Sequence, residues 1–276
     1  MEIFAILPNI QMAKSSPGKG LARALENSQQ SGNHIIYATI SQNTYIDPSE
    51  QMATSKPDQS KSRGYSGTFI TLEGPEGAGK TTQVKLLSTK LDALEIPHVI
   101  TRDPGGTPLG KQIRRILLAP GGTVCPMAEL LLYQADRAQH VAEVIMPALQ
   151  DGKLVICDRY IDSTVAYQGY GRGIDMETIN KLNQMSTLGL MPELTILFDL
   201  ESEKGLGRLH PGGHDRLERE AIEFHHKVRN GYLAIAEAQP KRFEVIDATK
   251  ALISVQEDLK RIIYEHFSDR YPGLNT

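Results

Sequence analysis

"GPEGAGKT", residues 74–81, has the spacing Gly-x4-Gly-Lys-Thr of a phosphate-binding loop. The apolar run "TFITLE" at 68–73 precedes it, and apolar residues at three- and four-residue steps follow it over 84–94, which is the period of a helix. The loop is therefore expected between a strand and a helix N-terminus, where backbone N–H groups and the helix dipole favour an anion. The pattern predicts a loop that holds the phosphates of a nucleoside triphosphate.

The residue types in this loop suit both phosphate and metal. The glycines allow positive φ angles and a close approach of backbone N–H groups to phosphate oxygens. Lys80 adds a positive charge for the β- and γ-phosphates, and Thr81 can offer its hydroxyl to Mg²⁺. A glycine-rich turn with a surface lysine is the alternative, but the flanking patterns favour a nucleotide site. Because Lys80 would stand on a solvated loop, we expect folding to survive its replacement.

The composition is that of an ordinary globular protein. The chain has 276 residues, 40% of them hydrophobic, and a formal net charge of −3, so no basic excess indicates nucleic acid. Cys125 and Cys157 lack the spacing of a metal site or a disulfide framework, which fits a reducing cytoplasm. No apolar run approaches the roughly 20 residues that a membrane-spanning helix needs. We therefore expect a cytoplasmic protein without nucleic-acid or membrane partners.

The N-terminal part of the chain differs in character from the rest. Residues 1–66 are rich in Ser, Gln, Lys, Gly and Pro, and we expect a mostly disordered extension, although its apolar segments 3–10 and 34–40 could dock. A secretory signal would need a basic start, and a transit peptide would need more Arg and fewer acids. The alternative is a start codon placed too far upstream, with Met52 as an internal candidate. We expect the folded domain at 67–276.

After this extension, apolar strands alternate with helical patterns. This order is typical of a parallel sheet covered by helices on both faces, which binds its ligands at the carboxyl ends of the strands. The predicted fold is α/β: a P-loop NTPase-type three-layer α/β/α arrangement with a five-stranded parallel sheet and a short lid at about 207–216. The expected strands are 68–73, 97–102, 153–158, 193–200 and 242–247. The expected helices are 80–94, 110–119, 127–152, 176–189, a short helix between the strand 193–200 and the lid, 217–238 and 252–267.

Charged residues gather where the second and third strands end, in "TRDPGGT" (101–107) and "DRYIDSTVAYQGYGRG" (158–173). Asp158 is a candidate to orient Mg²⁺ through water, and the planar guanidinium of Arg159 suits a phosphate. One Asp-Arg pair at a strand end could equally be structural. Further charged residues converge on the same edge, however, and indicate a second phosphate-bearing substrate. They are Arg102, Asp103, Arg114 and Arg137.

Six segments in this order resemble the thymidylate kinase family, of the bacterial kind. They are "FITLEGPEGAGKTTQ", "TRDPGGTPLGKQIR", "YQADRAQH", "CDRYIDSTVAYQGYGRGI", "PELTILFDL" and "DRLERE". The resemblance covers about residues 67–268, and the "DRY…S-T-x-A-Y-Q-G-x-G-R-G" run is nearly specific to the family. It implies a dTMP kinase that makes dTDP from dTMP and ATP with Mg²⁺, for the synthesis of dTTP. Family members are generally homodimers.

The resemblance also implies roles for the matching residues. The implied ATP site is Gly74, Pro75, Glu76, Gly77, Ala78, Gly79, Lys80, Thr81 and Thr82. The implied dTMP site is Asp103, Arg114, Tyr133, Arg137, Arg159, Thr164, Tyr167 and Gln168. In that site Arg114 and Arg159 hold the phosphate, Tyr133 stacks on the base, and Arg137 reaches the thymine carbonyl edge. Tyr167 crowds the deoxyribose so that a 2′-hydroxyl fits poorly.

Phosphoryl transfer depends mainly on positioning and on cations around the moving group. We therefore expect Lys80 and Arg159 to be catalytic together with Asp158, and Thr81 and Asp158 to hold Mg²⁺. The acceptor is an ionised phosphate oxygen, so no general base is proposed. Asp103 stands where the family usually has Glu, and its shorter side chain could reach its ligand through water.

The lid is where the sequence departs from the family. Glu76 stands where one branch of the family has an Arg, and the other branch compensates with arginines in the loop that closes over ATP. Here that loop, "GRLHPGGHDRLERE", is poor in arginine. We expect Arg216, whose "DRLE" setting matches the family, as the first candidate for a cation at the transition state and Arg208 as the second. The alternative is that both make only surface ion pairs.

Two other functions stay open from the residues. The chain could be a P-loop kinase of another nucleoside monophosphate, such as dUMP, dCMP or AMP, and a site built for one base edge would reject the others. It could also be a nucleotide-binding protein without turnover, although neither the loop lysine nor the "DRY" segment is broken. For a homodimer, helix 127–149 is the candidate interface, with ordinary core burial as the alternative.

Overall fold

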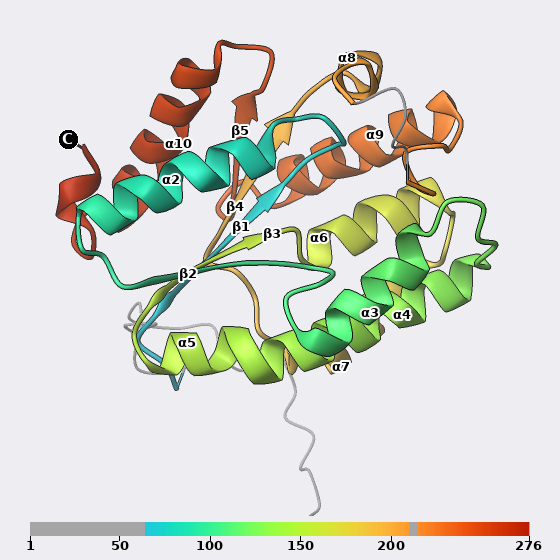
Figure 1. The fold of residues 1–276 in the computed structure, drawn as a ribbon, viewed down its shortest axis with the longest axis horizontal. Coiled ribbons are helices and arrows are strands. Elements are labelled where there is room, and N and C mark those ends of the chain that lie inside the picture. Colours follow the sequence, from blue (N-terminus) through green and yellow to red (C-terminus); the bar gives the residue numbers. More distant parts are fainter. Residues whose placement is uncertain (1–63, 210–214, 276) are drawn as a thin grey trace, which may run out of the picture. The chain divides into compact units, whose positions relative to one another are not determined.

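The computed structural model describes residues 64–209 and 215–275. The extension up to residue 63 and the lid tip at 210–214 lie outside the described residues, so the expectations for them stay predictions. Figure 1 shows the elements in chain order: β1 (Thr68–Glu73), α2 (Lys80–Ala93), β2 (His98–Arg102), α3 (Pro108–Leu118), α4 (Pro126–His140), η3 (Val141–Ile145), α5 (Met146–Gln150), β3 (Leu154–Asp158), α6 (Ile161–Thr164), η4 (Val165–Gly171), α7 (Met176–Thr187), β4 (Leu194–Asp199), α8 (Ser202–Gly207), α9 (Ile222–Ala238), β5 (Phe243–Asp247), α10 (Leu252–Phe267) and η5 (Pro272–Asn275).

The strands form one parallel sheet in the order β2-β3-β1-β4-β5. Strand β1 is central: the chain first fills the half of the sheet with β2 and β3, and then the half with β4 and β5. The carboxyl end of β1 therefore lies where the strand order reverses, which is where such sheets bind ligands. The register sets Leu72, Asp158 and Arg102 level with one another, so the loop after β1 lies beside the ends of β3 and β2.

Helices cover both faces of the sheet (Figure 1). On one face, Leu87 of α2 and Leu259 of α10 pack in a buried cluster with Ile70 of β1. On the other face, Phe69 of β1 packs with residues of η3 and α5, and Leu197 of β4 packs with residues of α9. Because successive strand residues point to opposite faces, both sides of the sheet are apolar. The predicted three-layer α/β/α fold with a five-stranded parallel sheet is confirmed.

Some helices differ from those expected. The helix predicted at 127–152 forms as α4, η3 and α5, with a π-helical turn before Pro147, whose missing N–H cannot complete the regular helical pattern. The helix expected from 217 begins at Ile222, because Asp215 Oδ1 accepts the backbone N–H groups of Leu217 and Glu218 and closes a turn there. None of the described helices is both long and apolar enough to cross a membrane.

A helical segment at 161–171, made of α6 and η4, was not expected. Its sequence "IDSTVAYQGYG" has two glycines and three β-branched residues, which disfavour a helix. The carboxylate of Glu73 accepts the N–H groups of Tyr160 and Ser163 at the start of the segment, at 2.7 and 3.3 Å. A cap from a distant strand therefore supports this helix, and a local pattern does not reveal it.

Candidate active site

The phosphate loop turns sharply between β1 and α2. Gly77 and Gly79 have φ angles of 71° and 85°, in the left-handed region that favours glycine. A Cβ on Gly77 would lie 2.0 Å from the carbonyl oxygen of Gly205 in α8, so only glycine lets the loop pass this close. Gly79 is the N-cap of α2. The loop thus presents its N–H groups at a helix N-terminus, as an anion site requires.

Lys80 is buried in its own loop. Its side chain is only 7% exposed, and Nζ donates to the carbonyl oxygens of Gly74 and Pro75, both at 2.9 Å. Burial, and then the charge of Arg159, lower the pKa of Lys80 to about 8. The expected solvated position for Lys80 is wrong, because the loop curls around the amino group and binds it through these two carbonyl oxygens.

A cavity over this loop contains most of the residues expected to bind ATP. Its lining includes Glu76, Gly77, Ala78, Gly79, Lys80, Thr81 and Thr82, together with Asp158, Arg159 and Arg208. Gly74 and Pro75 do not line it and instead direct their carbonyl groups to Lys80. We call this space the phosphate cavity.

The two expected Mg²⁺ ligands lie in the phosphate cavity. Thr81 is exposed at the start of α2, and Asp158 ends β3. Asp158 Oδ2 is 3.5 Å from Arg102 Nη2, whereas Oδ1 is buried and has no hydrogen-bond donor among the described residues. A carboxylate oxygen that lacks a donor and a nearby hydroxyl are the hard oxygen ligands that Mg²⁺ prefers. The residues present therefore fit the ion.

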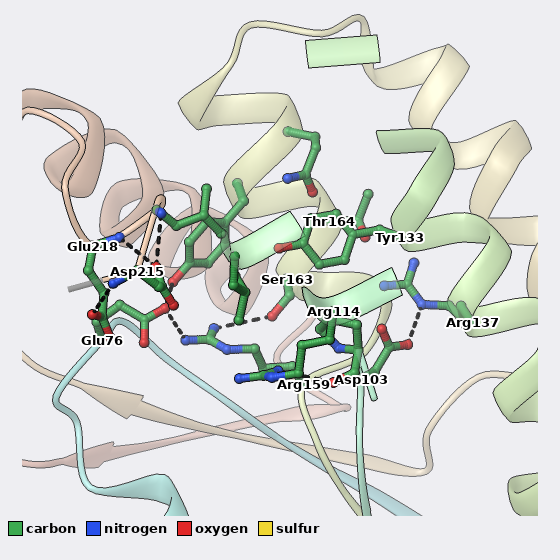
Figure 2. A pocket seen from close by; sticks show the side chains of 15 residues that line it. Glu76, Asp103, Arg114, Tyr133, Arg137, Arg159, Ser163, Thr164, Asp215 and Glu218 are labelled. Carbon is green, nitrogen blue, oxygen red and sulfur yellow. Dashed lines mark hydrogen bonds and ion pairs between the residues drawn. The ribbon is translucent and has the colours of Figure 1, made fainter. Parts of the chain in front are cut away.

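A second cavity opens beside the first, and we call it the acceptor cavity (Figure 2). All the residues expected to bind dTMP line it: Asp103, Arg114, Tyr133, Arg137, Arg159, Thr164, Tyr167 and Gln168. Several charged residues line both cavities: Glu76, Asp103, Arg114, Arg159 and Glu218. The two cavities therefore meet at these side chains, where a phosphate in one can face a phosphate in the other.

Arg159 lies at this meeting point, with a φ angle of 73° that is strained for a residue other than glycine. Its Nη2 donates to Glu76 Oε1 at 2.7 Å, a pair drawn in Figure 2. Burial of Glu76 raises its pKa, but the charges of Arg159 and Lys80 outweigh burial and lower the pKa to about 2. Glu76 is thus a carboxylate with which any anion at Nη2 of Arg159 would have to compete.

Arg137 lies at the other end of the acceptor cavity and is 1% exposed. Its Nε donates to Asp103 Oδ2 at 2.8 Å, a pair drawn in Figure 2. Its terminal nitrogens donate to Asn183 and to the carbonyl oxygen of Tyr160. Burial, and then the nearby Asp103, raise the pKa of Asp136 to about 7. Asp103, Asp136 and His140 lie close enough to share a metal ion, but the guanidinium of Arg137 already supplies the cation there.

The side chains expected around the base and sugar come from α4 and from the helical segment 161–171. Tyr133 of α4 and Thr164, Tyr167 and Gln168 line one cavity. The hydroxyl of Tyr167 donates to Glu76 Oε1 at 2.8 Å, so this hydrogen bond connects the wall of the acceptor cavity to the phosphate loop. Thr164 Oγ1 is buried without a hydrogen-bond partner among the described residues, and a ligand in this cavity could supply one.

The two lid arginines lie in different places. Arg208, at the end of α8, donates to the carbonyl oxygens of Gly77 and Ala248 at 3.4 and 3.3 Å and lines the phosphate cavity. Arg216 lines neither cavity, since it donates to the carbonyl oxygen of Leu117 at 2.8 Å and to Glu129 at 2.5 Å. In this structure Arg208 is therefore beside the phosphate loop and Arg216 is not.

Sequence reasoning missed several polar residues that hold this site together. Glu73, Ser163 and Tyr232 are hydrogen-bonded to one another behind Arg159. Glu129 is fully buried and accepts hydrogen bonds from Arg172, Arg216 and Gln168. The signal for Glu73 was present, because a lone acid ends an otherwise uncharged strand just before the loop. Glu129 gives no such signal, since acids are common on helices.

The phosphate loop lies at the switch point of a parallel sheet and opens toward a second cavity lined by arginines. This arrangement is that of a phosphotransferase, which transfers a phosphoryl group between two phosphate-bearing ligands. Among proteins of this class, the thymidylate kinase family model matches residues 72–259. Because this match covers more than half of the 276 residues, the chain belongs to the thymidylate kinase family. The expected activity, phosphorylation of dTMP, is confirmed at the level of the family.

Similar proteins agree with this placement. The chain is 50% identical over 202 residues to the thymidylate kinase of Pelotomaculum thermopropionicum, a match that covers 72% of this chain and 94% of that one. It is 55% identical over 185 residues to that of Carboxydothermus hydrogenoformans, covering 67% and 90%. The crystal structure of thymidylate kinase from Ehrlichia chaffeensis superposes with a TM-score of 0.60 at 34% identity, over 71% of this chain and 98% of that one.

Proposed function

We propose that the chain transfers the γ-phosphoryl group of ATP to the phosphate of dTMP and so forms dTDP. One observation carries this proposal: the acceptor cavity contains all eight residues expected to bind dTMP and shares Arg114 and Arg159 with the phosphate cavity. The phosphates of two nucleotides can therefore meet at a pair of guanidinium groups. In-line transfer needs this proximity and the cations more than it needs covalent help from the protein.

On the donor side, the loop 74–81 binds the triphosphate through its backbone N–H groups. Lys80 exchanges its two carbonyl partners for the β- and γ-phosphate oxygens, whose negative charge stabilises its protonated amino group. Bound Mg²⁺ neutralises part of the phosphate charge, and Thr81 and Asp158 are the residues that would hold it, the latter through water. Arg208 is the lid cation that lies nearest to these phosphates in this structure.

On the acceptor side, Arg159 and Arg114 bind the phosphate of dTMP. Tyr133 stacks on thymine, and Arg137, held in place by Asp103, faces the carbonyl edge of the base. Tyr167 narrows the space at the sugar, which supports a preference for the deoxyribose. Since the attacking phosphate oxygen is already ionised, these residues orient the acceptor and balance its charge, and none removes a proton.

The decisive experiment measures ADP formation with a panel of monophosphates: dTMP, dUMP, dCMP and AMP. We expect dTMP to give the highest kcat/KM, because polar groups placed for the thymine edge remain unpaired with other bases. A higher value for dCMP or AMP would mean that the acceptor is another nucleotide. Binding of ATP without ADP formation with any acceptor would favour a nucleotide-binding protein that lacks turnover.

We further propose that the protein is a cytoplasmic homodimer. Four apolar side chains are 44–54% exposed on α3 and α4, two helices that lie next to each other (Figure 1): Leu109, Ile116, Met127 and Leu131. On each helix the two residues are spaced by seven or four positions, so they share a face. Such a surface supports contact with a second copy. Cys125 and Cys157 are both free, which suits a reducing compartment.

A further inference from the structure

Glu73 is a fully buried carboxyl group directly beneath the phosphate loop. Its Oε1 accepts the backbone N–H groups that open the helical segment 161–171, as described above. Its Oε2 lies 2.6 Å from Ser163 Oγ and 2.9 Å from the hydroxyl of Tyr232. These two hydroxyl groups lie 2.7 Å from each other. The three oxygens therefore form a closed triangle in which every side has the length of a hydrogen bond.

The number of hydrogens available to these three contacts decides whether Glu73 is ionised or neutral. Each side needs one hydrogen, and Ser163 and Tyr232 supply one each. If Glu73 is ionised, two hydrogens serve three contacts, and one pair of oxygens opposes its lone pairs at short distance. If Glu73 carries a proton on Oε2, three hydrogens serve three contacts. The observed geometry is therefore that of a neutral carboxylic acid.

The charges around Glu73 agree with this count. Burial, followed by the carboxylate of Asp162, raises the pKa of Glu73 to about 7, although Arg159 opposes the shift. The charged and titratable groups that interact with it come from several elements: Asp162 of α6, Arg159 after β3, Cys157 of β3, Lys80 of α2, Arg137 of α4 and Tyr232 of α9. The proton on Glu73 is thus exchanged near neutral pH.

The triangle holds one end of Arg159. Nη1 of Arg159 donates to the hydroxyl of Tyr232 at 2.9 Å, to the carbonyl oxygen of Gly74 at 3.0 Å and to Ser163 Oγ at 3.3 Å. Both hydrogens of Nη1 are therefore committed to the protein. Nη2 points instead to Glu76, whose side chain is 24% exposed and lines the acceptor cavity. One nitrogen is an anchor and the other faces the place where a phosphate binds.

We propose that Glu73 is a positioning residue for Arg159. In its neutral form it completes the triangle with two hydroxyl groups, and the triangle fixes Nη1 and leaves Nη2 for the acceptor phosphate. Loss of the proton removes one hydrogen from the triangle and places a negative charge behind Arg159, so both effects weaken the hold on a phosphate dianion. The inference rests on the proposed role of Arg159 at the phosphate of dTMP.

The test compares the dissociation constant of dTMP for the full-length protein and for Glu73→Gln between about pH 6 and pH 8.5, by calorimetry. Glutamine keeps an acceptor for the N–H groups and donates amide hydrogens to the hydroxyls without taking a charge. The phosphate of dTMP itself titrates near pH 6, but this is common to both proteins and cancels in the ratio. We expect the wild type to lose about three- to tenfold in affinity relative to Glu73→Gln as pH rises through 7.

Glu143→Gln, an exposed acid of η3, is the matched control and should follow the wild type at every pH. A ratio between wild type and Glu73→Gln that stays constant with pH would overturn the proposal. If Glu73 were only structural, the substitution Glu73→Gln would lower the melting temperature without producing this pH dependence. If dTMP binds to none of these proteins while another monophosphate does, the proposed acceptor is wrong, and the same comparison is made with that nucleotide.

Tyr232→Phe provides a second measurement in case Glu73→Gln does not fold. It removes one hydrogen of the triangle and one acceptor of Nη1 without changing the charge. We expect its dissociation constant for dTMP to rise about three- to tenfold, because a net hydrogen bond to a charged group is lost, while that for a non-hydrolysable ATP analogue stays the same. Unchanged affinity for dTMP in Tyr232→Phe would overturn the proposal, as would an equal loss for both nucleotides.

Discussion

At the scale of single residues, Lys80 is a buried cation within the phosphate loop. The amino group is buried against two carbonyl oxygens, and a triphosphate in the phosphate cavity would have to replace them as its partners. Removing a cation that acts on a transferring phosphoryl group costs a few kcal/mol, so we expect Lys80→Ala to lose about 100-fold or more in kcat. A coupled ADP assay measures this, with the exposed Lys85→Ala as control.

Because Lys80 is not solvated, its replacement also leaves the carbonyl groups of Gly74 and Pro75 without their partner. We therefore expect a modest fall in the melting temperature together with an unchanged circular dichroism spectrum. Near-wild-type turnover by Lys80→Ala would contradict the role of the loop, whatever its stability.

Asp136 gives a prediction about pH and stability. Burial and Asp103 raise its pKa in the folded protein to about 7, well above the value near 3.9 of an unfolded chain. Between these values the folded protein holds a proton that the unfolded chain has lost, so stability falls as pH rises from about 4 to 7 and stays low above 7. Asparagine has no proton to lose, and its amide can donate to Asp103 Oδ1, which has no hydrogen-bond partner among the described residues.

We therefore expect the melting temperature of Asp136→Asn, relative to the wild type, to be higher at pH 8 than at pH 5 by a few degrees. Calorimetry at the two pH values checks this. Asp151→Asn, an exposed acid after α5, is the control and should show no such trend. An equal difference at both pH values would mean that Asp136 is ionised throughout.

At the scale of elements, the apolar periodicity of the sequence predicted those helices and strands whose limits depend on nearby residues alone. The central strand 68–73 and the last long helix 252–267 form with the expected limits, because their apolar periods match their own geometry. The helical segment 161–171 could not be found in this way, since a carboxylate of β1 caps it. The start of α9 also differs from the prediction, because the side chain of Asp215 accepts the N–H groups that follow it and closes a turn before the helix.

The end of α8 and the lid give a prediction at this scale. Arg208 already touches the phosphate loop, whereas Arg216 must leave Glu129 before it can approach a nucleotide. We expect Arg208→Ala to lose about 10- to 100-fold in kcat with little change in the KM for dTMP, because a cation used mainly in the transition state is removed. We expect a smaller loss for Arg216→Ala.

Lys204→Ala, on the exposed face of α8, is the control for both lid variants and should behave as the wild type. A larger loss for Arg216→Ala than for Arg208→Ala would restore the order expected from the sequence. If both single variants and the double variant turn over normally, neither lid arginine is catalytic.

At the scale of the whole molecule, the site depends on how distant segments meet. The resemblance to a family predicted eight of the residues that line the acceptor cavity, and the parallel sheet brings them to one edge. The sequence could not show which partners these residues have before a ligand binds. The pairing of Arg159 with Glu76, and of Arg137 with Asp103, follows only from the packed structure.

The N-terminal extension leads to one prediction. The family match begins at residue 72, and the first strand begins at Thr68. Tyr65 packs against the buried cluster of β1, η3 and α5, so it belongs to the folded domain. A chain that begins at Gly64 should therefore keep the melting temperature and the kcat of the full-length protein, and one that begins at Ser66 should be slightly less stable. Loss of activity in the chain from Gly64 would mean that the extension contributes to the domain.

The proposed dimer gives the last prediction. Ile116 of α3 and Leu131 of α4 are half exposed on neighbouring helices, and a charge on each would oppose its burial against a second copy. The double variant Ile116→Glu with Leu131→Glu should sediment as a monomer near 30.5 kDa, whereas the wild type should sediment at twice that mass. Ile253→Glu, at an even more exposed apolar position of α10 on the opposite face of the sheet, should leave the mass unchanged. If the wild type is itself a monomer, the apolar face of α3 and α4 does not bind a second copy, and a dimer is not needed to complete the site.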